Sequence, residues 1–258
     1  MGTLQPLRPG TVTLVAGGPG DPGLMTVAGR AAVEQADVLL VDHLAPQGAL
    51  AWTRAEAEVV DVAKLPRGRT TPQERINELL VGHARAGRRV VRLKGGDGFV
   101  FGRGMEELLA CTEAGVDVRV LPGVSSAVAV PALAGIPVTH RGLVHGFSVI
   151  SGHVPPGHPG CTLDYAALAR SGTTLVVLMG VANLAAIANA LLSHGLASGT
   201  PAAVVARGGH PDQQVRTAPL AGIAAAAQDL APPAVTVIGE VAAFAGTAAP
   251  LDILQETR

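Results

Sequence analysis

The chain has 258 residues, of which 48% are hydrophobic and 15% charged, so it can bury one large core or two smaller ones. A formal net charge of -1 gives no electrostatic case for nucleic acid or an anionic membrane as a partner. No stretch approaches the roughly 20 apolar residues of a membrane helix, and the two cysteines have no metal or redox spacing. We therefore expect a soluble, cytoplasmic protein with reduced thiols.

Strand-like and helix-like segments alternate along the first half of the chain. This alternation predicts a mostly parallel sheet covered by helices, which is an α/β fold. The segments span residues 11–16, 23–36, 38–41, 46–52, 59–62, 72–86, 89–93, 104–114 and 116–121.

The helix expected at 72–86 has the clearest start signal. Thr71 is placed to cap it, Glu74 completes a capping box with Thr71, and Pro72 occupies a position where a missing N–H is harmless.

Two glycine-rich loops follow apolar runs, at residues 17–23 and 95–98. Loops at the carboxyl ends of parallel strands are where ligands bind. The first contains the letters G-x-G-x-x-G at Gly18, Gly20 and Gly23, and Asp42 ends the next apolar run. This pattern leaves open a nicotinamide-dependent oxidoreductase that binds a dinucleotide.

The other residues of the first loop disfavour a diphosphate. Pro19 and Pro22 remove two backbone donors, and Asp21 adds a carboxylate where the anion would lie. A ligand with an adenosine and a cationic centre is better tolerated by such a loop.

A domain boundary is expected near residues 139–146, which gives domains 1–140 and 141–258. The preceding segment, 122–139, is rich in small residues and contains Pro131 and Pro137, so we expect a turn, a short helix and an exit. The second domain again has an α/β pattern, with strands at 147–150, 174–179, 202–205, 214–217 and 235–238 and helices at 183–192 and 220–230.

Two charged or metal-binding residue types cluster along the sequence. Residues 64–103 are rich in lysine and arginine, which suits either a site for a polyanionic small molecule or ordinary solvated surfaces.

Four histidines lie close together in the sequence, but no carboxylate or thiol pattern accompanies them, so we expect no metal site. They are His140, His145, His153 and His158.

Motifs along nearly the whole chain together resemble the uroporphyrinogen-III C-methyltransferases, a class of tetrapyrrole methyltransferases. The resemblance rests on Gly-Pro-Gly-Asp-Pro at 18–22, Asp42, Lys64, residues 72–77, 91–104, 122–126, 134–142, 178–180 and 238–241.

This resemblance implies two α/β domains with a cleft between them for S-adenosylmethionine (SAM), which leaves as S-adenosylhomocysteine. It also implies a homodimer that methylates uroporphyrinogen III twice to give precorrin-2, for siroheme or cobalamin synthesis. The positions that match the family's SAM site are Pro19, Gly95, Gly96, Asp97, Val100, Ser125, Ser126, Met179 and Gly208, with Thr236 as a further candidate.

The same resemblance assigns Asp42 and Lys64 as acid–base residues, with Asp42 the proton acceptor and Lys64 the donor. Lys94, Arg103 and Arg141 are expected to bind the carboxylates of the tetrapyrrole. Methylation of a later corrin intermediate is the alternative within the family, since SAM binding is shared while substrate contacts differ.

Overall fold

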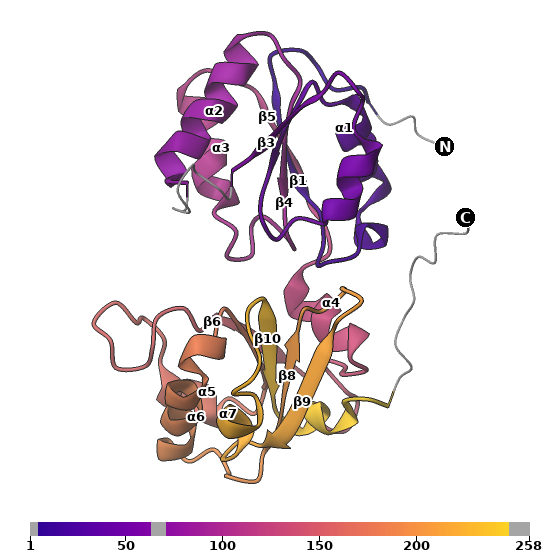
Figure 1. Cartoon of the computed structure of the whole chain (residues 1–258). Coiled ribbons are helices and arrows are strands. Elements are labelled where there is room, and N and C mark those ends of the chain that lie inside the picture. The colour runs from indigo at the N-terminus through magenta and orange to yellow at the C-terminus, as the bar shows by residue number, and fades with distance from the viewer. Residues whose placement is uncertain (1–4, 63–70, 248–258) are drawn as a thin grey trace. The chain divides into compact units, whose positions relative to one another are not determined.

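The computed structural model describes residues 5–62 and 71–247 and divides the chain into two compact units, Met1–Ser125 and Ser126–Arg258 (Figure 1). The sequence pattern places this boundary later, near residue 140. The difference arises because helix α4 (Ser126–Leu133), which runs through Pro131, packs on strands β7 and β10 of the second unit. No helix in the described part of the chain is both long and apolar enough to cross a bilayer.

The first unit contains a five-stranded sheet in the order β3-β2-β4-β1-β5. All of its pairings are parallel, with Val12 opposite both Val90 and Val118, and Val38 also opposite Val90. The strands are β1 (Val12–Ala16), β2 (Val38–Val41), β3 (Glu58–Asp61), β4 (Val90–Lys94) and β5 (Val118–Leu121).

Helices cover both faces of this sheet (Figure 1). Side chains alternate along β2, so that Leu39 packs in the cluster that contains residues of α1, and Leu40 packs in the cluster that contains residues of α2 and α3. This doubly covered parallel sheet confirms the α/β class expected from the alternating pattern. The helices are η1 (Pro22–Leu24), α1 (Val27–Gln35), η2 (Gln47–Trp52), α2 (Gln73–Arg85) and α3 (Gly104–Glu113).

The expected capping of α2 by Thr71 is wrong. Pro72 occupies the cap position, and no side-chain hydrogen bond caps the helix. Thr71 lies one residue too early for its hydroxyl to reach the amides of the first turn.

The second unit contains a mixed sheet in the order β6-β7-β10-β8-β9. Only β6 and β7 pair in parallel, while β10 pairs antiparallel with both β7 and β8, and β8 pairs antiparallel with β9. The elements are β6 (Phe147–Ser151), α5 (Tyr165–Arg170), β7 (Thr174–Leu178), η3 (Val181–Asn183), α6 (Leu184–Ser193), β8 (Pro201–Ala206), β9 (Gln214–Pro219), α7 (Ile223–Ala226), β10 (Ala234–Ile238) and η4 (Glu240–Phe244).

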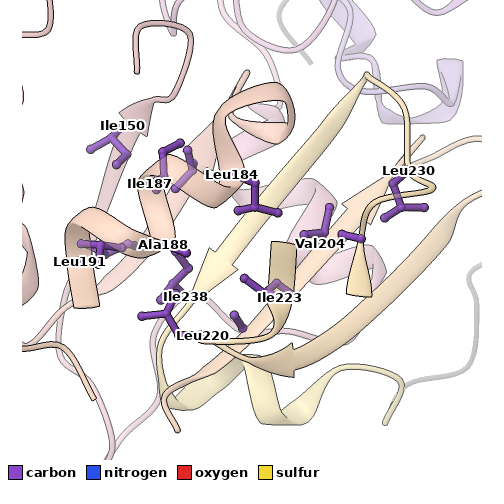
Figure 2. Packing of buried hydrophobic residues seen from close by; sticks show 14 of the residues in the cluster. Ile150, Leu184, Ile187, Ala188, Leu191, Val204, Leu220, Ile223, Leu230 and Ile238 are labelled. Atoms are coloured by element: carbon purple, nitrogen blue, oxygen red, sulfur yellow. The ribbon is translucent and has the colours of Figure 1, made fainter. Parts of the chain in front are cut away.

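One hydrophobic cluster fills the space between this sheet and helices α5, α6 and α7. Ile187 and Leu191, one helical turn apart on α6, are fully buried in it with Ile223 of α7 and Ile238 of β10 (Figure 2). The cluster includes residues of β7 and β8, the two strands that Met179 and Gly208 follow.

Candidate functional site

The carboxyl edge of the parallel sheet carries most of the candidate residues of the first unit. In the strand order β3-β2-β4-β1-β5, the chain leaves β1 toward β2 on one side and leaves β4 toward β5 on the other. The neighbouring strands β1 and β4 therefore form a topological switch point, where α/β proteins bind ligands. The two glycine-rich loops follow these two strands.

The two glycine-rich loops are hydrogen-bonded to each other. The N–H of Gly18 donates to the carbonyl of Gly96 at 3.1 Å, and the N–H of Gly96 donates back to Gly18 at 2.9 Å. Both residues have positive φ, 74° for Gly18 and 62° for Gly96, a conformation that favours glycine. We call this pair of hydrogen bonds the glycine bridge.

Gly95 is also required by close packing. A Cβ at Gly95 would lie 2.3 Å from the carbonyl oxygen of Leu44, in the loop after β2. A Cβ at Gly17 would similarly lie 2.6 Å from Cδ of Pro46. The loops after β1, β2 and β4 thus pack directly against one another, with no room for a side chain at Gly17 or Gly95.

Asp97 joins the loop after β4 to the loop after β5. Its Oδ1 accepts the N–H of Phe99 at 2.8 Å, and its Oδ2 accepts the N–H of Gly123 at 3.0 Å. The carboxylate remains partly exposed, and Asp97 lines a small cavity with Ala16 and Pro122. Val100 is partly exposed in the same loop.

The loop after β1 lacks the features of a diphosphate site. Pro19 is buried, and the carboxylate of Asp21 accepts the N–H of Gly23 at 2.6 Å as the cap of η1. Helix α1 begins only at Val27, and Thr26 caps it by accepting the N–H of Gly29. The G-x-G-x-x-G letters therefore do not open a helix whose free amides could bind phosphate.

Asp42 directly follows β2 at the same edge. Its Oδ1 accepts a hydrogen bond from Nη2 of Arg92 at 2.5 Å, and its Oδ2 lies 3.6 Å from Nζ of Lys94. The Asp42 side chain is 31% exposed, whereas those of Arg92 and Lys94 are only 2% and 4% exposed. Asp42 is therefore the part of this ionic group that solvent reaches.

The position of Lys94 differs from the expectation that it binds substrate carboxylates. Its ammonium group is buried and donates to Glu107 at 2.9 Å. A cation that is already neutralised and enclosed in this way is not presented to an external anion. The basic stretch is likewise divided, because Arg88 and Arg89 lie at the opposite edge of the sheet and pair with Glu58 and Asp37.

Arg103 and Arg141 are both exposed. Arg103 precedes α3 and has a φ of 59°. Its Nε and Nη2 donate to Oε1 and Oε2 of Glu106 at 2.8 and 2.5 Å. These hydrogen bonds hold the pKa of the Glu106 carboxyl below its usual value. Arg141 lies in a tight turn closed by hydrogen bonds between His140 and Val144, and it has no hydrogen bond or ion pair to the described residues.

Ser125 and Ser126 are the last residue of the first unit and the first residue of the second. Both are partly exposed, and α4 begins at Ser126. Lys64, the expected proton donor, lies outside the described residues.

The second unit places its candidates at strand ends and within the sheet. Met179 follows β7, is 48% exposed and has a φ of 57°. Gly208 follows β8, where a Cβ would lie 2.5 Å from Cγ1 of Val130. Thr236 is 1% exposed within β10, and its hydroxyl has no hydrogen-bond partner among the described residues. Strained φ at Met179 and an unpartnered buried hydroxyl are both features that functional sites retain.

The four clustered histidines have separate surroundings. His140 stacks on Phe244 with ring centroids 5.2 Å apart, and Nδ1 of His158 accepts the N–H of Gly160. Within residues 5–62 and 71–247, no three His, Cys, Asp or Glu side chains are grouped so that they could hold a metal ion.

Glu107 is a site residue that the sequence analysis missed. It is fully buried and contacts both cations behind Asp42. A sequence signal exists, because Glu107 shares the buried face of α3 with Gly104 and Cys111 at helical spacing. An acidic residue on an apolar helix face predicts a buried cationic partner.

Comparison with known proteins is consistent with this geometry. The family model described as Tetrapyrrole (Corrin/Porphyrin) Methylases matches residues 11–224. Siroheme synthase 1 of Yersinia pseudotuberculosis is 47% identical over 232 residues, which cover 90% of this chain and 49% of that protein. A siroheme synthase of Neisseria meningitidis serogroup B gives the same identity over 90% of this chain and 48% of its own length. The chain spans about half the length of the curated relatives it matches.

Solved structures show the same fold. Uroporphyrin-III C-methyltransferase from Thermus thermophilus is 41% identical with a TM-score of 0.76, covering 90% of this chain and 98% of that chain, and a further structure of it contains S-adenosyl homocysteine. A cobalt precorrin-4 methyltransferase of cobalamin biosynthesis has 25% identity and a TM-score of 0.80, covering 90% and 96% of the two chains. From the family match over most of its length and these identities, the chain belongs to the tetrapyrrole (corrin/porphyrin) methylase family.

Proposed function

We propose that this chain is a SAM-dependent C-methyltransferase that methylates uroporphyrinogen III twice and forms precorrin-2. The observation that carries the proposal is the 41% identity to the Thermus uroporphyrin-III C-methyltransferase over 98% of that protein. The 47% identity to about half of a siroheme synthase supports the same reaction and a place in siroheme synthesis. Use of the product for cobalamin remains a proposal from the resemblance alone.

The residues at the carboxyl edge fit SAM better than a dinucleotide. Asp21 adds a negative charge to this loop, and Pro19 and Pro22 lack the N–H donors that a diphosphate needs, whereas the cationic sulfur of SAM is not repelled by Asp21. When bound, SAM supplies an electrophilic methyl group on its sulfonium. The residues proposed to hold it are Pro19, Gly95, Gly96, Asp97, Val100 and Ser125 of the first unit and Ser126, Met179, Gly208 and Thr236 of the second.

Glycine turns and the unpartnered hydroxyl of Thr236 suit such a ligand for different reasons. The backbone at Gly95 and Gly96 carries no side chain, so a ligand can approach it closely. The Thr236 hydroxyl can still donate and accept a hydrogen bond. Methyl transfer needs orientation and exclusion of water more than it needs a protein nucleophile.

Asp42 is proposed to accept a proton from the tetrapyrrole as a pyrrole carbon is methylated. Its carboxylate is the exposed end of an otherwise buried ionic group, so it can contact a substrate while remaining oriented by Arg92. Lys64 remains the proposed proton donor.

Arg103 and Arg141 are proposed to bind the carboxylates of the tetrapyrrole. A guanidinium pairs bidentately with a carboxylate, and both side chains are exposed. The pairing of Arg103 with Glu106 is at the surface, so a substrate carboxylate can replace it at little cost. Because Lys94 is buried, we assign it to the orientation of Asp42 instead.

Two further properties are proposed from the resemblance: a homodimer and a cytoplasmic location. Sedimentation of the purified chain tests the homodimer, and a monomer at micromolar concentration contradicts it.

Action on a later corrin intermediate has no observation in its favour, since identity to the cobalt precorrin-4 enzyme is only 25%.

The deciding experiment is anaerobic incubation with SAM and uroporphyrinogen III, followed by absorbance and mass spectrometry. We expect a product that carries two added methyl groups, together with S-adenosylhomocysteine. Methylation of a later corrinoid alone contradicts the proposed substrate. In a thermal-shift experiment, stabilisation by NAD but not by S-adenosylhomocysteine contradicts methyl transfer altogether.

A further inference from the structure

Three buried charged side chains lie behind Asp42, and the proposed reaction uses none of them directly. Arg92 and Lys94 are two residues apart on β4, so both point to the face that α2 and α3 cover. Glu107 projects from α3 onto the same face. Its side chain is 0% exposed, and those of Arg92 and Lys94 are 2% and 4% exposed. We call Asp42, Arg92, Lys94 and Glu107 the carboxyl-edge cluster.

Glu107 joins both cations through one oxygen atom. Its Oε1 accepts from Nε of Arg92 at 3.0 Å and from Nζ of Lys94 at 2.9 Å, with Nε2 of Gln73 at 3.4 Å. Its Oε2 is buried and has no hydrogen-bond partner among the described residues. The negative charge of Glu107 is therefore divided between two cations.

Arg92 is fixed in place by the backbone as well. Its Nη1 donates to the carbonyls of Leu40 at 3.4 Å and Leu93 at 3.3 Å, which leaves Nη2 directed at Asp42. These contacts, together with that to Glu107, restrict the orientation of the guanidinium. The Asp42 carboxylate is consequently oriented by a rigid group rather than by a mobile surface side chain.

Stability alone does not account for this arrangement. Buried ion pairs are often no more stabilising than apolar residues of the same volume, because each charge loses its hydration. A buried carboxylate oxygen without a partner adds a further penalty. Active sites often contain such clusters, because buried charges there set the environment of a reacting group.

We propose that Glu107 is a positioning residue that sets the charge environment of Asp42 through Arg92 and Lys94. With Glu107 present, the cluster holds two positive and two negative charges, so Glu107 balances part of the cationic charge that faces Asp42. Without it, two cations face Asp42 alone. This inference rests on the proposed role of Asp42 in the reaction.

Other charged groups surround the cluster and stay unchanged in the experiment below. Glu106 interacts electrostatically with Lys94, and Arg103 interacts with Glu74 and Glu107. Asp97 lines a small cavity together with Lys94. His43 follows Asp42 in sequence, and Asp61 ends β3, the neighbour of β2.

The first test measures the titration of Asp42 without substrate. The carbon-13 chemical shift of its carboxyl group is measured against pH in the unmodified chain, in Glu107→Gln and in Lys94→Gln. Removing a negative charge favours the ionised carboxylate, so the midpoint in Glu107→Gln falls by about one pH unit. Removing a positive charge has the opposite effect, so the midpoint in Lys94→Gln rises by a similar amount.

The opposite signs separate positioning from a general loss of structure, which moves both variants in the same direction. Cys111→Ala is the matched control, because Cys111 is fully buried one turn along α3 and carries no charge. Its Asp42 midpoint stays within about 0.2 pH units of the unmodified chain. If Glu107→Gln does not fold, Lys94→Gln alone decides, and an unchanged midpoint in either folded variant overturns the proposal.

The second test uses turnover. Glu107→Gln lowers kcat at least about tenfold, moves the acid limb of the pH–rate profile to lower pH and leaves KM for SAM within about twofold. An equal loss in KM and kcat with no movement of the pH profile contradicts positioning. If the chain transfers no methyl group to uroporphyrinogen III but the Asp42 midpoints still move as stated, the proposed function fails and the charge balance stands.

Discussion

Strands β2 and β4 carry an ionic cluster at each end, and the two clusters use the same residue types differently. At the amino edge, Asp37 accepts hydrogen bonds from the backbone, Nε and Nη2 of Arg89 at 2.8, 3.0 and 2.7 Å, and from Arg54 at 2.5 Å. At the carboxyl edge, Asp42 binds Arg92, and Glu107 lies behind it.

The difference lies in what each carboxylate has left to do. Both oxygens of Asp37 are taken by arginine donors, and these hydrogen bonds, chiefly that of Arg89, lower its pKa well below the usual value. The amino-edge cluster therefore fastens strand ends together. At the carboxyl edge the counter-charges are buried, and Oδ2 of Asp42 lies 3.6 Å from Nζ of Lys94, beyond hydrogen-bond distance, which leaves this oxygen for the proton transfer proposed above.

The largest expected contrast is between Asp42→Asn and Asp37→Asn. Asp42→Asn removes the proposed proton acceptor, so kcat falls by about 10²- to 10⁴-fold while SAM affinity is retained. Asp37→Asn keeps kcat within about twofold, since Asp37 lies at the opposite edge. Steady-state kinetics and calorimetric titration with SAM measure both. An unchanged rate in Asp42→Asn removes this residue from catalysis.

Glycine substitutions sharpen the same contrast between the two edges. Gly95→Ala places a Cβ 2.3 Å from the carbonyl oxygen of Leu44, so a loop must move, and we expect about 3 kcal/mol of lost stability together with weaker SAM binding. Gly87, at the amino edge, has a φ of 77° and nothing within 4 Å of an added Cβ. Gly87→Ala costs about 1 kcal/mol from backbone strain and leaves SAM binding unchanged. Urea unfolding measures the stability of the two variants, and calorimetric titration measures their affinity for SAM. Equal losses of SAM affinity in Gly95→Ala and Gly87→Ala argue against the glycine-rich loops as the SAM site.

The third expected effect is the pH dependence of the free energy of unfolding at the amino edge, which is smaller than the effect of Gly95→Ala. The pKa of Asp37 is lower in the folded chain than in the unfolded chain, so its contribution is present above about pH 4 and is lost as pH falls below that value. We expect the free energy of unfolding of the unmodified chain to exceed that of Asp37→Asn by about 2 kcal/mol at pH 7. This difference in stability should decrease as the pH is lowered. A gap that stays constant between pH 7 and pH 3 shows that hydrogen bonding to Arg89 does not set it.

The sequence predicted the fold class and most strands because apolar runs and glycine-rich turns are local signals. The expected segment at residues 38–41 coincides with β2, and the expected 89–93 differs from β4 (Val90–Lys94) by one residue at each end. Local sequence signals do not place the domain boundary, because it depends on the packing of α4 against β7 and β10, which lie far along the chain. The mixed parallel and antiparallel pairing of the second sheet could likewise not be predicted from the alternation of strand-like and helix-like segments.

The site was predictable where a motif marks it and not where packing decides. The glycines of the loops that carry Pro19 and Gly95, and the strands before them, predicted ligand-binding turns, and the structure places both loops at the carboxyl edge of the parallel sheet. Lys94 was expected to bind substrate, because its sequence position gives no sign that Glu107 lies against it. The pairing depends on the rotation of α3 over the sheet, which only tertiary structure fixes.

The glycine bridge bears on the thermodynamics of ligand recognition. Because two backbone hydrogen bonds within the fold join Gly18 and Gly96, much of the conformational entropy of these turns is lost during folding. Calorimetry of SAM binding should then report only a small ordering penalty from these turns of the proposed SAM site. Rigid recognition of this kind favours discrimination by shape, so analogues with bulky ribose substituents should be rejected rather than accommodated.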